Sequence, residues 1–236
     1  MSSSTIIMQT GEFAVSQDSE NKFTISLTSF NNQELANSIL DLDVLPCNSI
    51  LQTRHECVIS FNAVYVQPFL EYRQQFKEDP VLAYKDALKM THDLALQINY
   101  LIYHCKKTFL GFSPANVLVV DKCKFVYLCS EYLMNLDIEE NEDATNKTTC
   151  TITYPFSSDF FFSPELFHIR AIPAQIHYKV AYFSFACLIL SIFTTLPMNA
   201  EGIHTAGLEK IKHTKLHAFL KRCMVPQIQN RVLLFL

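Results

Sequence analysis

The first 70 residues alternate between polar and apolar positions in short runs, which is the pattern of β-strands that bury one face. Residues 23–27 alternate in this way, and the polar stretch 17–21 before them predicts the turn of a hairpin. Two further apolar runs, at 50–51 and 57–61, suit strands, and residues 31–42 suit a short helix. The pattern therefore predicts a β-rich beginning of the chain.

A helical period replaces this alternation from residue 80. Asp79 is a good N-cap, Pro80 suits the first helical position, and apolar residues then recur every three or four positions as far as Ile102. We therefore predict one long helix over 80–102.

A compact turn and a second hairpin follow this helix. After the turn at 111–116, the apolar runs 117–120 and 125–128 predict two strands joined by a tight turn at 121–122. Residues 137–149 carry five acids and no long apolar run, which predicts an exposed, mobile loop.

From Ser163 onward the pattern favours helices with irregular connections, and one segment allows two interpretations. Residues 180–195 are almost wholly apolar, which approaches the length of a transmembrane helix. Serine and threonine residues within the segment, and the lack of flanking basic clusters, favour a helix buried in a large domain. We predict the buried helix, with a membrane span as the alternative. The fold class is α+β, with a β-rich part over 1–70 and a mainly helical part over 71–236.

Composition and charge narrow the functional classes. The chain has 19 basic and 23 acidic residues and no basic block, so nucleic acid is not an expected partner. Its eight cysteines form no C-x-x-C pair and mostly fall in apolar runs, which predicts reduced core thiols in a cytoplasmic protein. The first ten residues lack the pattern of a secretory signal. Only four glycines occur, and none builds a glycine-rich phosphate loop.

The order of these elements resembles the protein-kinase superfamily. A β-rich part, a long helix, a Pro-x-Asn loop at 114–116, a hairpin, an acidic loop, Ser-Pro-Glu at 163–165 and an apolar helix follow one another as in that family. The resemblance is strongest over 84–231, and the shortness of the chain is similar to that of kinase-like proteins of large DNA viruses. It implies a bilobal fold with a reduced β-rich N-lobe, 1–70, and a helical C-lobe, 71–236.

The residues that transfer phosphate in kinases are replaced in this sequence. The family's catalytic loop, His-Arg-Asp-x-x-x-x-Asn, is similar to residues 109–116, where Asn116 matches but the position of the base falls on Gly111. The magnesium-binding Asp-Phe-Gly aligns with 129–131 and places Cys129 at the Asp, although a thiol is a poor ligand for magnesium. Glu131 is the residue there that could substitute as a ligand.

Two further positions depart from the family. The resemblance places the lysine that grips the nucleotide on strand 23–27, where Leu27 occupies the position and Lys22 only begins the strand. Ala181 replaces the Asp that ties the central apolar helix to the catalytic loop, which implies a loop that is no longer held. With phosphate loop, lysine, base and magnesium Asp all missing, the resemblance implies a pseudokinase with no metal and no expected cofactor.

One pair of family residues is retained. Glu165 matches the glutamate of the Ala-Pro-Glu segment, and Arg231 matches the arginine that pairs with it. The resemblance therefore implies a partly buried, bidentate ion pair between them.

These features predict a catalytically inactive kinase-like protein that binds or scaffolds another protein, a kinase or its substrate, in the cytoplasm, or in the host-cell cytoplasm if it is viral. One alternative is a divergent active serine/threonine-type kinase that binds ATP and magnesium through Asn116 and Glu131. The other is a membrane-anchored protein with a span at 180–195.

The acidic run 137–143 and the basic run 210–222 are candidate docking surfaces. The threonines beside the acidic run are candidate phosphorylation sites: Thr145, Thr148, Thr149 and Thr151.

Two smaller groups favour structural roles. His213 and His217 have the spacing of a zinc-binding pair, but lysines surround them and no third ligand is evident, so a solvated basic face is expected. Cys123 and Cys129 flank a predicted strand and lie six positions apart, so they should point to the same side, as core residues rather than metal ligands.

Overall fold

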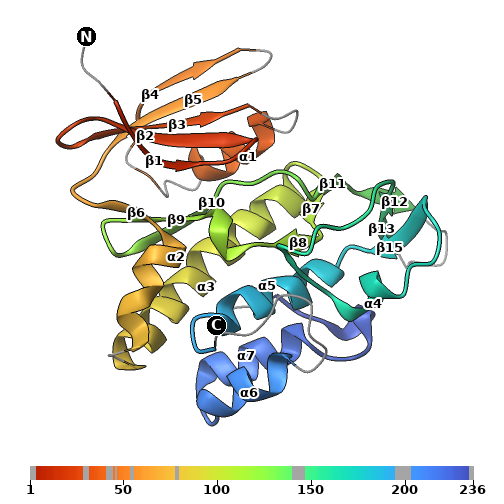
Figure 1. Cartoon of the computed structure of the whole chain (residues 1–236). Helices are drawn as coiled ribbons and strands as arrows, with labels where there is room; N and C mark the ends of the chain where they lie inside the picture. The colour runs from red at the N-terminus through yellow and green to blue at the C-terminus, as the bar shows by residue number, and fades with distance from the viewer. Residues whose placement is uncertain are drawn as a thin grey trace. The chain divides into compact units, whose positions relative to one another are not determined.

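The computed structural model of the chain describes residues 4–28, 32–40, 45, 47–53, 56–77, 80–139, 147–194 and 203–233. The chain folds into two compact units, the first made of Met1–Leu101 with Ala115–Glu131 and the second of Ile102–Pro114 with Tyr132–Leu236. Strands dominate the N-terminal part and helices become frequent later (Figure 1). The predicted α+β class is therefore confirmed.

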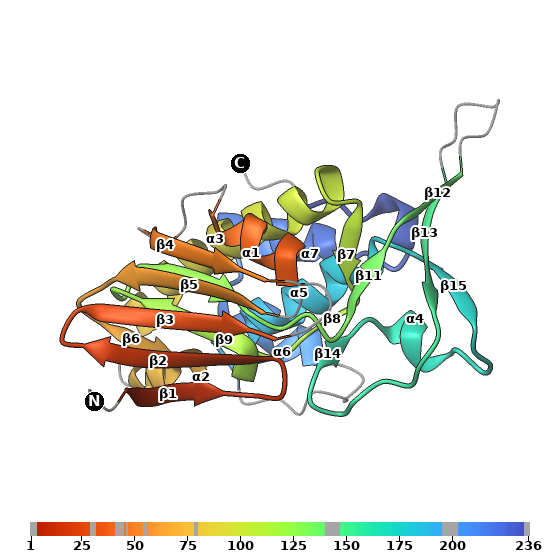
Figure 2. The ribbon, with the colours of Figure 1, turned by 90° about the horizontal axis from the view of Figure 1, so that it is seen from above.

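Five antiparallel strands form the main sheet of the first unit, in the order β1-β2-β3-β5-β4 (Figure 2). They are β1 (Thr5–Gln9), β2 (Phe13–Ser19), β3 (Lys22–Leu27), β4 (Cys47–Gln52) and β5 (Cys57–Asn62). The helix α1 (Asn32–Leu40) follows β3 and contacts β5. Burial alternates along β3 and β5, so one face of the sheet carries the core. The predicted hairpin, short helix and two further strands are confirmed, whereas β1 was not predicted.

The long helix α3 (Pro80–Tyr103) spans 24 residues and confirms the helix predicted from the apolar period. Its proposed N-cap, Asp79, lies outside the described residues. Before α3 come β6 (Val66–Pro68), α2 (Phe69–Tyr72) and η1 (Arg73–Lys77), and after it the short turn η2 (Pro114–Asn116). The predicted second hairpin is β9 (Val117–Val120) and β10 (Lys124–Tyr127), with β6 on the far side of β9. Asp121 and Lys122 have φ of 50° and 55°, which the tight turn of this hairpin requires.

Two polar side chains of α3 bind the backbone of β10. Asp93 Oδ2 accepts the Phe125 N–H at 3.0 Å. Gln97 accepts the Tyr127 N–H at 3.1 Å and donates to the Tyr127 carbonyl at 2.9 Å. These bonds satisfy backbone groups that would otherwise be buried without partners, so they fix the hairpin against the helix.

The described residues of the second unit form short strands and short helices. β7 (Lys107–Phe109) pairs with β11 (Leu133–Asn135), β8 (Gly111–Phe112) pairs with β14 (Phe161–Phe162), and β13 (Lys147–Ile152) lies between β12 (Asp137–Glu139) and β15 (Ala174–His177). The helices are α4 (Pro164–Phe167), α5 (Val180–Leu190), α6 (Ile203–Lys210) and α7 (Lys215–Cys223), followed by the turn η3 (Ile228–Asn230). α6 and α7 both pack on α5 (Figure 1).

All eleven residues of α5 are buried. The interpretation of this segment as a core helix is therefore confirmed for residues 180–190. No helix within the described ranges is both long enough and apolar enough to cross a membrane.

The acidic segment was predicted as one exposed loop over 137–149, and this is wrong at both ends. Residues 137–139 form β12, which pairs with the beginning of β13. The rest of the acidic run, with Thr145, lies outside the described residues. Threonines dominate the start of β13, and their β-propensity outweighs the charge count on which the prediction relied. Thr149 is only 3% exposed, so it is not accessible for modification, while Thr148 and Thr151 are half-buried.

The histidine and cysteine pairs separate in the structure. His213 precedes Thr214, the N-cap of α7, while His217 lies inside the helix, so the pair does not share one helical face. The charged residues around them are exposed, as expected for a solvated basic face. Cys129 is buried, but Cys123 is exposed, so the prediction of two core cysteines is wrong for Cys123. Residue 123 belongs to the hairpin turn, and strand alternation does not apply to it.

Candidate functional site

One carboxylate of the first unit accepts hydrogen bonds from three donors. Glu12, in the loop between β1 and β2, receives the Ser130 N–H at 2.7 Å, the Ser130 hydroxyl at 3.2 Å and the Cys129 thiol at 3.3 Å, all on Oε2. Cys129 and Ser130 are buried and follow the β9–β10 hairpin. The segment that the resemblance aligns with a magnesium-binding motif therefore binds a side chain of the chain itself.

The thiol in this cluster is suited to donating a hydrogen bond. Burial raises the pKa of Cys129 far above its usual range, and the charge of Glu12 adds to this effect. The sulfur therefore stays protonated at neutral pH. In the part of the chain that the structure describes, no group of three His, Cys, Asp or Glu side chains is arranged to hold a metal ion.

The other residues that the resemblance assigns to a nucleotide site differ in burial. Asn116 is buried and its carbonyl accepts the Leu128 N–H at 3.0 Å, whereas Glu131 is exposed. Leu27 is buried in the sheet, and Lys22 is exposed at the start of β3. Magnesium binding by Asn116 and Glu131 stays a prediction.

In the second unit, Gly111 faces an aromatic ring. Gly111 of β8 lies opposite Phe162 of β14, and a Cβ atom on Gly111 would lie 2.7 Å from Phe162 Cδ1 and closer still to Cε1. The ring cannot easily move away, because it is buried against Phe156 and Tyr132, with centroid distances of 4.7 and 5.0 Å. The position that the resemblance gives to a general base has no room for a side chain.

The backbone next to Gly111 is nevertheless held by α5. The Ser184 hydroxyl donates to the Leu110 carbonyl at 2.7 Å. Ala181 cannot form the hydrogen bond that the resemblance gives to an Asp at that position, but Ser184 supplies one from the next turn of the same helix. That the loop is no longer held for chemistry stays a prediction.

Glu165 and Arg231 form the ion pair expected from the sequence. Arg231 Nη2 donates to Glu165 Oε1 at 2.5 Å, and Nη1 donates to Glu165 Oε2 at 3.3 Å. The Arg231 side chain is 1% exposed and that of Glu165 is 25% exposed. Ser163 donates to the same carboxylate and accepts from Arg231 Nη1 at 3.0 Å, while Arg231 Nε donates to the Val225 carbonyl at 3.0 Å.

These contacts change the ionisation of Glu165. Burial by itself would raise its pKa, but the hydrogen bonds from Ser163 and Arg231 together outweigh burial, so the pKa of Glu165 lies below its usual value. The buried guanidinium is therefore neutralised by an ionised partner.

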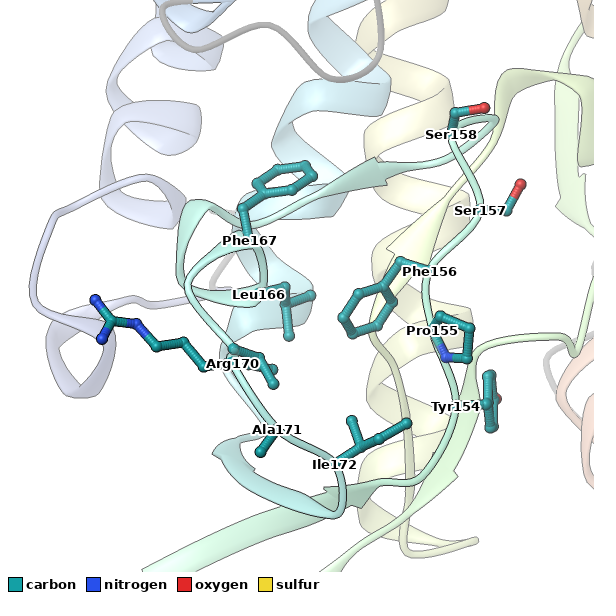
Figure 3. Close-up of a pocket in the computed structure, with 11 residues that line it drawn as sticks. Tyr154, Pro155, Phe156, Ser157, Ser158, Leu166, Phe167, Arg170, Ala171 and Ile172 are labelled. Atoms are coloured by element: carbon teal, nitrogen blue, oxygen red, sulfur yellow. The ribbon is translucent and has the colours of Figure 1, made fainter.

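A largely apolar cavity lies in the second unit at the C-terminal end of α4. It has a volume of about 480 Å³ and is lined by residues 154–158, 166, 167 and 169–172. The side chains of Phe156, Leu166 and Ile172 converge in it, whereas Arg170 is directed away from them (Figure 3). Phe167 and Ile172 are 52% and 48% exposed. No local pattern in the sequence marks this cavity, because one wall, 154–158, precedes β14, while the other is formed by the end of α4 and the residues that follow it.

Sequence reasoning also missed Glu12, Phe162 and Ser184. Each acts through a partner from a distant part of the chain, so no local motif marks it. In comparisons with known proteins, no family model matches the chain and no curated protein matches it significantly.

Proposed function

We propose that this chain is a catalytically inactive protein-kinase-like protein that acts by binding another protein. The order of elements supports the kinase-like part: a five-stranded sheet with one helix, the long α3, a Pro-x-Asn turn, the β9–β10 hairpin, Ser-Pro-Glu at the start of α4, and the buried α5. The bilobal arrangement, the cytoplasmic location and a viral source belong to this proposal.

The observation that carries the loss of catalysis is the contact between Gly111 and Phe162. A kinase needs a carboxylate at this position to accept the proton of the substrate hydroxyl. Here the place of its Cβ is filled by a packed aromatic ring. A rearrangement that restored a base would have to remove the ring as well.

The cavity beside α4 supports a binding role. Its lining is mostly apolar and aromatic, with two serines and Arg170 among the lining residues, and Phe167 and Ile172 leave about half of their surface in water. Exposed apolar side chains gathered at a concave site are typical of surfaces that bind a partner. The proposed occupant is an apolar side chain of a kinase or of its substrate.

Thermal-shift titration and a phosphoryl-transfer assay test the loss of activity. Wild-type protein should show no shift with ATP, with or without magnesium or manganese, up to about 1 mM, because a ligand that binds the native state must raise the melting temperature. It should also transfer no labelled phosphate. Metal-dependent transfer would establish the divergent kinase that binds through Asn116 and Glu131 and would overturn the proposal.

The binding role has its own test. A partner identified by crosslinking in cells should lose about tenfold or more in affinity with Phe167→Ser, a loss of about 1.4 kcal/mol. Val81→Ser is the matched control, because Val81 is 66% exposed on α3 in the first unit. Equal binding by both variants would exclude the cavity as the docking surface.

A further inference from the structure

We propose that the Cys129–Ser130 turn is an anion-binding site whose resident ligand is the carboxylate of Glu12, and that displacing Glu12 opens the site to an external carboxylate or phosphate. The inference rests on the proposed function, in which this segment has lost its catalytic metal, and it assigns the segment a different use.

The donors at the turn are arranged for one anionic oxygen. The Ser130 N–H, the Ser130 hydroxyl and the Cys129 thiol converge on Glu12 Oε2 within 2.7 to 3.3 Å. All three donors are neutral, and hydrogen bonds to an ionised acceptor are stronger than bonds between neutral groups. Backbone and hydroxyl donors that point to one place are the usual elements of phosphate and carboxylate sites.

Glu12 is held in position to fill this site. The Thr10 side chain accepts the Glu12 N–H at 3.2 Å, and Thr28 donates its N–H and its hydroxyl to the Glu12 carbonyl at 2.8 and 3.1 Å. Because the backbone of Glu12 is bound on both sides, its carboxylate loses little further freedom when it reaches Ser130. The loop between β1 and β2 is thereby tied to the end of the β9–β10 hairpin.

This tie has a consequence for regulation. In kinases the loop over the nucleotide contacts the phosphates of a bound ligand. Here the carboxylate of Glu12 holds the β1–β2 loop to Ser130 without any nucleotide. Partner binding by the wild-type protein should therefore be the same with and without ATP.

The test replaces Glu12 in the full-length chain and offers small anions. Glu12→Ala should bind acetate and pyrophosphate at least about tenfold more tightly than wild type, as measured by thermal shift, because the donors that Glu12 occupies in wild type become accessible to the added anion. The Ser130 amide should exchange with solvent faster in Glu12→Ala, and saturating acetate or pyrophosphate should slow it again. Acetate reports carboxylate binding, and pyrophosphate reports phosphate binding.

Two further variants make the result decisive. Glu20→Ala removes the same charge from the next turn of the same sheet and should behave as wild type, which excludes a general effect of charge. Glu12→Gln keeps the size of the side chain and removes its charge, and it should show a smaller gain in anion affinity. It replaces Glu12→Ala in the test if that variant folds poorly.

The outcomes separate this inference from the proposed function. If neither Glu12 variant gains anion binding and the Ser130 amide exchanges as in wild type, the inference is wrong while the inactive protein stands. If wild-type protein transfers phosphate, the proposed function fails, whatever the Glu12 variants do.

Discussion

Glu12 in the first unit and Glu165 in the second both accept a hydrogen bond from a serine, but of the two only Glu165 forms an ion pair within the described residues. Around Glu12 the donors are neutral. Around Glu165 the main donor is a guanidinium that is 1% exposed. Removing Glu12 leaves neutral groups that water or a small anion can satisfy, whereas removing Glu165 leaves a buried charge without its partner. The same residue type therefore closes a binding site in one unit and stabilises the core in the other.

The largest expected effect is that of Glu165→Gln. It should lower the free energy of unfolding by about 3 kcal/mol or more, because the Arg231 charge would remain buried without a counter-charge. Urea unfolding followed by circular dichroism measures the change.

Glu209→Gln is the matched control for this variant. Glu209 pairs with Lys212 at 3.2 Å, but both side chains are more than half exposed, so the loss should stay within about 0.5 kcal/mol. If the two variants lost equal stability, the contrast between buried and exposed donors would not hold.

Local packing also differs between the two units, and one glycine from each unit measures this difference. Gly111→Ala should cost about 1–3 kcal/mol, because the new methyl group overlaps the ring of Phe162. At Gly11, next to Glu12, an added methyl group would have no atom within 4 Å, so Gly11→Ala should be neutral or should stabilise by up to about 1 kcal/mol.

A double-mutant cycle shows whether the ring causes the difference. In a Phe162→Ala background, Gly111→Ala should cost clearly less than in wild type, because the space next to Gly111 is then free. An unchanged cost would mean that the backbone at Gly111, and not the ring, excludes a side chain.

The comparison also shows what the sequence could reveal. The long helix follows from a local period of apolar residues, the second hairpin and the core helix follow from continuous apolar runs, and Glu165 with Arg231 follows from a family resemblance. Glu12 could not be found in this way, because its partners lie 117 and 118 positions away. The contact of Phe162 with Gly111 could not be predicted either, because the local sequence of Phe162 is that of any aromatic residue in a buried strand. Residues 137–139 and the start of β13 were misassigned because the acidic residues were given more weight than the β-propensity of the threonines, and because the pairing of β12 with β13 leaves no local pattern.

The smallest expected effect is the pH dependence of the second unit. Burial, followed by the charges of Lys179 and Arg231, lowers the pKa of His177 below its usual value. The unfolded chain then binds this proton more readily than the folded chain, so stability is complete above the ordinary pKa of 6.5 and declines as the pH falls below it. Glu165 acts in a lower window: its pKa is also lowered in the folded state, so its contribution is complete above the unfolded value of 4.5 and is lost as the pH falls through the folded value.

Urea unfolding at a series of pH values separates the two windows. His177→Asn should flatten the upper part of the curve and leave the acid part, whereas Glu165→Gln should flatten the acid part and leave the upper one. Each variant is thus the control for the other. If both variants still lost stability at acid pH as wild type does, neither His177 nor Glu165 would cause the acid sensitivity. The charge of Arg231 would then not explain why Glu165 and Glu12 differ.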